Sequence, residues 1–282
     1  MNNPLVSVIL PTYNRSQFIE KAIRSVWTQT YAELELVVIN DGSKDDTADI
    51  LDRLSQEDSR ITVIQMEKNS GIVAALNEGG LAAKGTYIAR LDDDDFWSDD
   101  KKIEKQVNFL ENNKEYVLVG GGVIRVDKDG KEIDRFLLPE KDEDIRKSIL
   151  VDNVFVHTTV LFRKDAFEKT GGYNQEFLYV EDWELWMHMG TMGKLYNFQE
   201  FFVTYLDQEA GNKNYYRNWG IRRNIKMSMS LKKKYRDKYP GYAKAAAVSW
   251  TSYIYSFLPL KKQLRPGLVN LRNRVVKSPY KK

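Results

Sequence analysis

The sequence places four consecutive carboxylates, Asp92 to Asp95, directly after an apolar segment. Like charges at this spacing repel one another and destabilise the fold unless a cation compensates them. Carboxylate oxygens suit Mg²⁺ or Mn²⁺, and Mg²⁺ usually takes one or two carboxylates together with substrate phosphates. A solvated acidic loop is the common alternative for an acidic run. Because this run follows a buried strand, beside other polar strand ends, we favour a metal site.

A second acidic pair, Glu181 and Asp182, lies in an apolar and aromatic setting between Tyr179 and Trp183. Burial raises the pKa of a carboxyl group, as a general base that works near neutral pH requires. The alternative is an acidic pair at a helix N-terminus, where negative charge complements the helix dipole. From the residues alone, both interpretations stay open.

Other polar residues give weaker signals. Asp41, in VVINDGSKDDT, is either a turn residue or a hydrogen-bond acceptor for the base or ribose of a nucleotide. The two histidines, His157 and His188, stand alone in the sequence, so we expect a buried, hydrogen-bonded structural role for both. The run from Gly120 to Gly122 lacks the Lys-Ser/Thr of a phosphate loop and predicts a close backbone approach.

Alternating strands and helices must position these side chains. Apolar runs predict strands at 5–10, 34–39, 61–66 and 87–91, and amphipathic spacing predicts helices at 16–27, 47–54 and 71–83. Ser16 is the expected N-cap of the first helix. This pattern predicts a parallel sheet with helices on both faces, whose ligands bind beyond the carboxyl ends of the strands. The clusters 11–14, 40–43 and 92–95 should therefore meet at one edge.

The pattern changes after a helix at about 101–112. We expect strands at 116–126, 131–138 and 154–163, helices at 142–150 and 179–189, and a basic helical region from about residue 213. The predicted organisation is a catalytic domain at 1–212, with a nucleotide-binding half at 1–115 and an acceptor half at 116–212. A basic helical C-terminal region at 213–282 follows.

Composition excludes several classes of protein. The 282 residues include no Cys and 2 His, which excludes a disulfide framework, a zinc-thiolate site and a thiol nucleophile. Apolar residues make up 42% and charged residues 29%, which excludes a polytopic membrane protein and a fully disordered chain. The N-terminal segment has no basic region and only a short apolar run, so we expect a cytoplasmic protein.

Charge is divided unevenly along the chain. Residues 213–282 hold 19 Lys and Arg against one acid, Asp237, whereas residues 1–212 hold 24 Lys and Arg against 39 acids. The uncharged aromatic segment 245–260 has 16 residues, short of the ~20 needed to span a bilayer. Trp and Tyr favour the membrane interface, so we expect 213–282 to lie on an anionic membrane, at the inner face of the plasma membrane. A helical appendage packed on the acidic domain is the alternative, and nucleic acid is not an expected partner.

Several segments, in their order along the chain, resemble inverting glycosyltransferase family 2 of the non-processive type. These segments, which fall within residues 5–206, are VSVILPTYNR, LELVVINDGSKDDT, NSGIVAALNEGG, GTYIARLDDDDFW, TGGYNQEF and YVEDWELWMHMG. The resemblance implies an α/β fold of the GT-A type, a Rossmann-like, mostly parallel sheet. It also implies a nucleotide-sugar donor, a divalent Mn²⁺ or Mg²⁺, and a saccharide or lipid-linked saccharide acceptor.

The resemblance also implies roles for individual side chains. By that likeness Asp182 is the catalytic base, Asp94 binds the metal, and the donor is held by Pro11, Tyr13, Asp41, Asp92 and Asp93, with Asp92 near the ribose. Asp95, Glu181 and Trp183 are candidate contacts to the acceptor or the phosphates. The implied reaction is transfer of a sugar from a nucleotide-sugar, most simply a UDP-sugar, to an acceptor hydroxyl with inversion. Cell-surface polysaccharide or glycolipid assembly is the expected setting.

The sequence departs from the family at several places, among them His188, where an Arg is common. It lacks the Gln-x-x-Arg-Trp motif and the transmembrane helices of processive synthases, which favours single additions. An Arg-x-His that many relatives carry is replaced here by Tyr205-Leu206-Asp207-Gln208.

Two other functions remain as alternatives. A nucleotidyltransferase needs a Gly-rich, basic loop after the first strand, where this chain has PTYNR. A non-catalytic nucleotide-sugar binder has no need of a base.

Overall fold

Strands and helices alternate through the first half of the chain. The computed structural model describes residues 3–207 and 221–257. Its first elements are β1 (Val6–Thr12), α1 (Ile19–Trp27), β2 (Leu34–Asn40), α2 (Thr47–Glu57), β3 (Ile61–Gln65), α3 (Ile72–Ala82) and β4 (Tyr87–Arg90). The strands β3, β2, β1 and β4 pair in parallel in that order, which confirms the parallel sheet expected for this half.

The second half extends the same sheet with mixed pairing. Its elements are β5 (Phe96–Trp97), α4 (Lys102–Asn112), β6 (Tyr116–Val126), β7 (Glu132–Phe136), α5 (Asp142–Ser148), the 3-10 turn η1 (His157–Thr159), β8 (Leu161–Arg163), α6 (Lys164–Thr170), the 3-10 turn η2 (Gln175–Phe177), α7 (Glu181–Met189) and β9 (Lys194–Leu206). The full order is β3-β2-β1-β4-β8-β6-β9-β5, with β7 paired to β6. β8 runs antiparallel to β4 and β6, and β6 runs parallel to β9.

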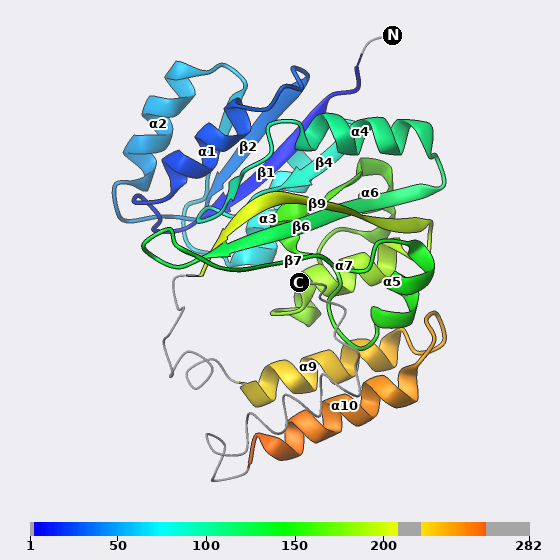
Figure 1. The fold of residues 1–282 in the computed structure, drawn as a ribbon. Helices are drawn as coiled ribbons and strands as arrows, with labels where there is room; N and C mark the ends of the chain where they lie inside the picture. The colour runs from blue at the N-terminus through cyan, green and yellow to red at the C-terminus, as the bar shows by residue number, and fades with distance from the viewer. Residues whose placement is uncertain (1–2, 208–220, 258–282) are drawn as a thin grey trace.

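Helices cover both faces of the sheet (Figure 1). Successive side chains of a strand point to opposite faces. Val8 and Leu10 of β1 accordingly pack in one core with residues of α1, α2 and α4, whereas Ile9 packs in a second core with residues of α3, α6 and α7. This arrangement confirms the predicted α/β architecture and leaves the carboxyl ends of the parallel strands free for a site.

Two more helices, α9 (Ile221–Lys234) and α10 (Tyr242–Tyr255), form a hairpin beside α7 (Figure 1). Leu231, Tyr235 and Tyr239 of this hairpin region are buried in the core that also contains Trp186 and Met187 of α7. The helical C-terminal region is thus observed within 221–257, and it shares a core with the preceding domain. The remaining parts of the predicted region, 213–220 and 258–282, lie outside the described residues.

Two local predictions are wrong. Ser16 does not cap a helix: α1 begins at Ile19, and the Ser16 backbone N–H donates to Asp45 Oδ2 over 3.1 Å. The apolar run 154–163 is a strand only from Leu161 to Arg163, preceded by η1. The turn is stable in the interior because the Thr159 hydroxyl donates to the Val156 carbonyl over 2.7 Å.

The close approach predicted at residues 120–122 is found: side chains crowd Gly120 and Gly121, and the Glu200 carbonyl lies 3.0 Å from a Cβ placed on Gly122. A Cβ placed on Gly120 would lie 2.4 Å from Asn197 Oδ1, and one on Gly121 would lie 2.3 Å from Phe202 Cδ2. These glycines let β6 and β9 pack tightly beside the loop that carries the site.

Candidate active site

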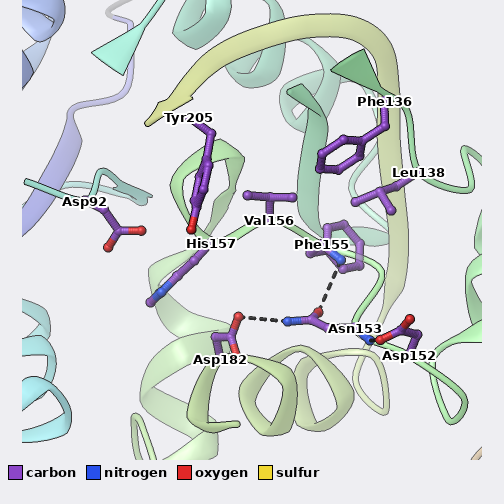
Figure 2. A pocket seen from close by; sticks show the side chains of 10 residues that line it. All are labelled: Asp92, Phe136, Leu138, Asp152, Asn153, Phe155, Val156, His157, Asp182 and Tyr205. Carbon is purple, nitrogen blue, oxygen red and sulfur yellow. Dashed lines mark hydrogen bonds between the residues drawn. The ribbon is translucent and has the colours of Figure 1, made fainter. Parts of the chain in front are cut away.

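Two acidic centres that are far apart in the sequence border one cavity. The cavity has a volume of about 350 Å³ and lies between Asp92, after β4, and Asp182, in the first turn of α7 (Figure 2). Its remaining wall comes from β7 and the loop after it, the segment before β8, and β9: Phe136, Leu138, Asp152, Asn153, Phe155, Val156, His157 and Tyr205. The fold therefore brings the predicted donor-side acid and the predicted base to the same space.

The side-chain amide of Asn153 holds the Asp182 carboxyl group in place. Its Oδ2 accepts a hydrogen bond from Asn153 Nδ2 over 2.8 Å, and its Oδ1 accepts one from the Trp183 backbone N–H over 2.6 Å. The Asn153 side chain cannot turn over freely, because its Oδ1 accepts from the Phe155 backbone N–H over 3.2 Å. Burial and the neighbouring Glu181 charge raise the pKa of Asp182 to about 7. This carboxyl can take up a proton near neutral pH.

The two neighbours of Asp182 face other surroundings. Burial raises the pKa of Glu181, and its Oε2 is buried without a partner in the described part of the chain. Trp183 is 7% exposed, and its indole N–H donates to the Ile149 carbonyl over 2.7 Å. Neither side chain is among the described residues that line the cavity. The buried, hydrogen-bonded indole of Trp183 fits a structural role better than a direct contact with an acceptor in this cavity.

The acidic run after β4 is surrounded differently, because it contacts cations. Asp92 Oδ1 accepts from Nη2 of the fully buried Arg90 over 2.5 Å, and Asp93 lies 3.4 Å from Arg15 Nε. Burial and the charge of Asp94 raise the pKa of Asp93 to about 7. Burial and the charges of Asp92 and Asp94 also raise the pKa of Asp95, whose Oδ1 accepts from the Leu206 backbone N–H.

The acidic run fits a divalent cation whose ligands are carboxylates of the run together with substrate phosphates. Within 3–207 and 221–257 no group of three Asp, Glu or His side chains is arranged to hold a metal alone. However, Asp95 Oδ2 is buried without a partner among the described residues, and neighbouring carboxylates raise one another's pKa. Crowded carboxylates at a strand end fit a Mg²⁺ or Mn²⁺ that takes one or two carboxylates and completes its shell with substrate oxygens.

The predicted nucleoside residues lie at the neighbouring strand ends. Pro11 is buried near the end of β1, and Tyr13 is 39% exposed in the loop that follows. Asp41 accepts backbone hydrogen bonds from Ser70, over 2.7 Å, and from Gly71, over 2.9 Å, so it fixes the loop before α3. Each of its oxygens keeps a second lone pair for a ligand. Both the turn role and the ligand role of Asp41 are compatible with this geometry.

Hydrogen bonds and an ion pair join the loops of the three predicted clusters at one sheet edge. The Asp41 backbone N–H donates to the Thr12 carbonyl over 2.9 Å, and the Lys44 backbone N–H donates to Asn14 Oδ1 over 2.8 Å. The Arg15–Asp93 ion pair connects the first of these loops to the acidic run. The predicted convergence is therefore confirmed, while the binding role of each side chain stays a prediction.

Sequence reasoning missed several residues of the site. Asn153 and Tyr205 line the cavity, and no motif marks Asn153. Arg90 is detectable as a lone cation in the apolar strand YIARL. His157 is hydrogen-bonded as expected, to Arg90 and Tyr173, but it also lines the cavity. His188 is half-buried beside the Tyr235 ring, away from the lining residues.

The segment that replaces the Arg-x-His of relatives is partly described. Tyr205 lines the cavity, and Asp207 pairs with Arg125 at 3.4 Å. Gln208 lies outside the described residues. Tyr205 is therefore the member of this segment that the structure brings to the site.

Comparison with known proteins identifies a family for this chain. Residues 7–171 match the family model "Glycosyl transferase family 2". The chain is 36% identical over 213 residues to an "uncharacterized glycosyltransferase" of Haemophilus influenzae, covering 72% of this chain and 66% of that relative. It is 32% identical over 192 residues to the amylovoran biosynthesis glycosyltransferase AmsE of Erwinia amylovora, covering 67% of this chain and 71% of AmsE. The chain thus spans about two thirds of the length of these relatives.

Two solved structures are similar in fold. Residues 1–349 of Staphylococcus aureus TarS in complex with UDP-GlcNAc superpose with a TM-score of 0.68 at 18% identity, covering 96% of this chain and 80% of that one. The mannosyltransferase PcManGT of Pyrobaculum calidifontis, in complex with GDP-Man and Mn²⁺, gives a TM-score of 0.61 at 19% identity, covering 98% and 83%. The sheet, the two acidic centres and these matches together assign this chain to glycosyl transferase family 2, with the GT-A fold.

Proposed function

We propose that this chain transfers a sugar from a nucleotide-sugar, most simply a UDP-sugar, to an acceptor hydroxyl, with inversion and in single additions. The observation that carries the proposal is the position of Asp182. A carboxyl group with a pKa of about 7 shares a cavity with Asp92, at the end of the strand where the donor is expected. The UDP-GlcNAc bound to TarS and the role of AmsE in amylovoran biosynthesis support a UDP-sugar and a polysaccharide or glycolipid product.

On the donor side, Pro11, Tyr13 and Asp41 hold the nucleoside, and Asp92 and Asp93 orient the ribose and diphosphate. Asp94 is the proposed ligand of a Mn²⁺ or Mg²⁺. When bound, such a cation compensates the negative charge of the diphosphate leaving group. The Mn²⁺ in the PcManGT complex supports this assignment.

On the acceptor side, the Asp182 carboxylate accepts the proton of the acceptor hydroxyl while that oxygen attacks the anomeric carbon. The new C–O bond forms as the bond to the diphosphate oxygen breaks, and the diphosphate leaves with the electron pair. A single displacement of this kind inverts the configuration. Asn153 keeps the Asp182 carboxyl oriented, through its 2.8 Å hydrogen bond.

A panel of nucleotide-sugars with saccharide and lipid-linked acceptors tests this function. We expect transfer with Mn²⁺, loss of transfer with EDTA, and a product whose anomeric configuration, measured by NMR, is opposite to that of the donor. A product with retained configuration would contradict the mechanism. Formation of a nucleotide-sugar and pyrophosphate from UTP and a sugar phosphate would favour the nucleotidyltransferase alternative.

We also propose that the hairpin places the enzyme on an anionic membrane. Within the described ranges, no helix has the length and apolarity needed to cross a bilayer. However, Trp250 and Ile254 are 54% and 61% exposed at the i, i+4 spacing of one face of α10, and Phe257, two residues after the end of that helix, is 52% exposed. Residues 221–257 also hold nine Lys and Arg against one acid, Asp237. An apolar stripe among cations fits anionic lipid headgroups.

Vesicle sedimentation tests the membrane contact. We expect the wild type to bind anionic vesicles, less tightly at high salt, and to bind neutral vesicles poorly. Trp250→Ser combined with Phe257→Ser should weaken binding. Leu81→Ser, at a residue of α3 that is 79% exposed, is the matched control and should not. A wild-type protein that stays in the supernatant with anionic vesicles at low salt would contradict the proposal.

A further inference from the structure

Three side chains form a hydrogen-bonded row beside the cavity. Arg90 is fully buried, and its Nε donates to His157 Nε2 over 3.1 Å. The Tyr173 hydroxyl lies 2.8 Å from the same nitrogen. The Arg90 guanidinium also donates to the Ile9 carbonyl over 2.9 Å, which fixes it to β1. The row therefore holds the His157 ring in one orientation.

The direction of these hydrogen bonds fixes the tautomer of His157. A guanidinium has only donors, so the nitrogen that faces Arg90 Nε must accept. His157 Nε2 is then unprotonated, and the neutral ring carries its proton on Nδ1. Burial and the positive charge of Arg90 lower the pKa of His157 well below its usual value, so the ring stays neutral. His157 thus has one N–H, on Nδ1.

The Nδ1–H is available to a ligand. Within the described part of the chain, the His157 ring nitrogens make hydrogen bonds only at Nε2. Nδ1 is also not one of the buried polar atoms without a partner. It is therefore reached by solvent, and His157 borders the cavity between Asp92 and Asp182 (Figure 2).

The cavity offers many acceptors to a sugar and few donors. Asp92, Asp152 and Asp182 present carboxylates, whereas the side-chain donors at its wall come from the second N–H of the Asn153 amide, the Tyr205 hydroxyl and His157. A sugar hydroxyl both donates and accepts, so it needs a donor as well as a carboxylate. A donor with a fixed direction discriminates strongly, because a ligand that leaves it unpaired loses binding.

We propose that His157 is a further substrate-binding residue, whose Nδ1–H donates a hydrogen bond to a hydroxyl oxygen of a saccharide between Asp92 and Asp182. The saccharide is either the acceptor or the transferred sugar, and the inference rests on the proposed function. His157 does not act as a base in this role. It orients an oxygen beside the Asp182 carboxyl, and Arg90 and Tyr173 are positioning residues that act through it.

The tautomer can be measured without activity. The chain has 2 His, so ¹⁵N-histidine labelling of the untagged protein gives two ring systems, and His188→Gln assigns them. We expect His157 to be protonated on Nδ1 and unprotonated on Nε2 from pH 6 to pH 8. A proton on Nε2, or a ring that titrates in this range, would overturn the proposal.

Two variants then separate the two nitrogens. In His157→Asn, an amide N–H replaces the Nδ1 donor, whereas His157→Gln places an amide near Nε2 and provides no donor at the Nδ1 position. We expect His157→Gln to reduce kcat/KM about tenfold, the cost of one hydrogen bond, and His157→Asn to retain more activity. His188→Gln, at a half-buried histidine away from the lining residues, should transfer like the wild type.

Steady-state kinetics identifies the bound sugar. A rise in acceptor KM with unchanged donor KM assigns the oxygen to the acceptor, and the reverse assigns it to the transferred sugar. UDP affinity with Mn²⁺, measured by calorimetry, should be equal in both variants and the wild type. Equal transfer by His157→Gln and the wild type, or an equal loss in both His157 variants, would overturn the proposal. If instead the wild type transfers no sugar from any donor, the proposed function fails while the NMR result still decides the tautomer.

Discussion

The acidic run after β4 and the acidic pair that begins α7 use the same chemical group in different surroundings. Burial raises the pKa of Asp93 and of Asp182 to about 7. Asp93 lies among other carboxylates and beside the Arg15 cation, whereas Asp182 contacts the Asn153 amide and has no ion pair within the described residues. A crowded acidic run favours binding a cation. A single carboxyl held by an amide favours exchanging a proton.

The largest expected effect comes from removing the proton acceptor. Asp182→Asn keeps the size of the side chain and an oxygen for the Asn153 amide, so the variant should fold and bind UDP with Mn²⁺ like the wild type. Loss of a general base should reduce the rate of transfer about 10²–10⁴-fold. Transfer assays and calorimetry on the same preparation measure both quantities.

This result would separate the two interpretations of Asp182 that the sequence leaves open. If the residue served only the helix N-terminus, Asp182→Asn would lose stability and keep its activity per folded molecule. Glu184→Gln, in the same helix, is a useful comparison. The buried Glu184 carboxylate accepts hydrogen bonds from Lys234 Nζ and the Tyr235 hydroxyl, each over 2.6 Å. The Glu184→Gln substitution should therefore reduce the free energy of unfolding more than the rate of transfer.

The next effect concerns the support of α7 by the C-terminal hairpin. Leu231 of α9 is fully buried against the core that contains Trp186 and Met187. Leu231→Ala should cost about 2–5 kcal/mol of the free energy of unfolding, because it leaves a cavity in this core. Chemical denaturation measures the loss.

The hairpin is hydrogen-bonded to α7, because Lys234 and Tyr235 donate to Glu184 and Tyr239 donates to the Met187 carbonyl. Hydrogen exchange in Leu231→Ala should therefore increase in α7 more than in β1 and β4. A variant that unfolds at the wild-type denaturant concentration would show that the hairpin does not stabilise α7.

The sequence predicted the strand ends that carry Asp41 and Asp92 better than the segment that carries Asn153 and His157, for a physical reason. Asp41 and Asp92 follow strands whose apolar runs are plain, and parallel pairing brings such strand ends together. His157 lies in a segment that the sequence indicates as a strand, and Asn153 directly precedes that segment. The local hydrogen bond of Thr159 and contacts with distant partners make it a turn. The Trp97 indole N–H, for instance, donates to the Thr158 carbonyl over 3.1 Å.

The hairpin illustrates the same limit. Its basic charge is visible in the sequence, and it predicts an anionic partner. Lys232 is nevertheless buried, and its Nζ donates to the Val151 carbonyl over 3.1 Å and to the Ser249 hydroxyl over 2.8 Å. No local sequence pattern predicts this packing.

A smaller effect is expected from weakening the proposed metal ligand. Asp94→Asn removes one negative charge from the acidic run and should reduce UDP affinity in Mn²⁺ about tenfold, while affinity in EDTA stays at the wild-type level. Calorimetry with both solutions tests this. Equal wild-type affinity in Mn²⁺ and EDTA would show that donor binding is independent of the metal.

The smallest effect is on stability as a function of pH, and it distinguishes the two acidic centres by sign. A carboxyl with an ordinary pKa of 3.8 and a folded pKa of about 7 keeps its proton in the folded state where the unfolded state has lost it. Each such group therefore lowers the free energy of unfolding as pH rises from about 4 to 7. Asn resembles the protonated carboxyl, so Asp182→Asn should melt higher than the wild type by a margin that grows from pH 5 to pH 8, where it reaches a few degrees.

Asp93→Asn provides the contrast. Without metal it should also melt higher than the wild type at pH 8, for the same reason. Mn²⁺ with UDP should then remove this advantage, because the ligands bind the folded wild type and compensate its ionised carboxylates. The advantage of Asp182→Asn should persist under those conditions, because Asp182 lies outside the acidic run that is proposed to bind the cation and the diphosphate. Thermal melts of the three proteins at pH 5 and pH 8, with and without Mn²⁺ and UDP, measure all of these differences. A wild type that is as stable as both variants at pH 8 would show that neither carboxyl has a raised pKa, and the two centres would then differ only in position.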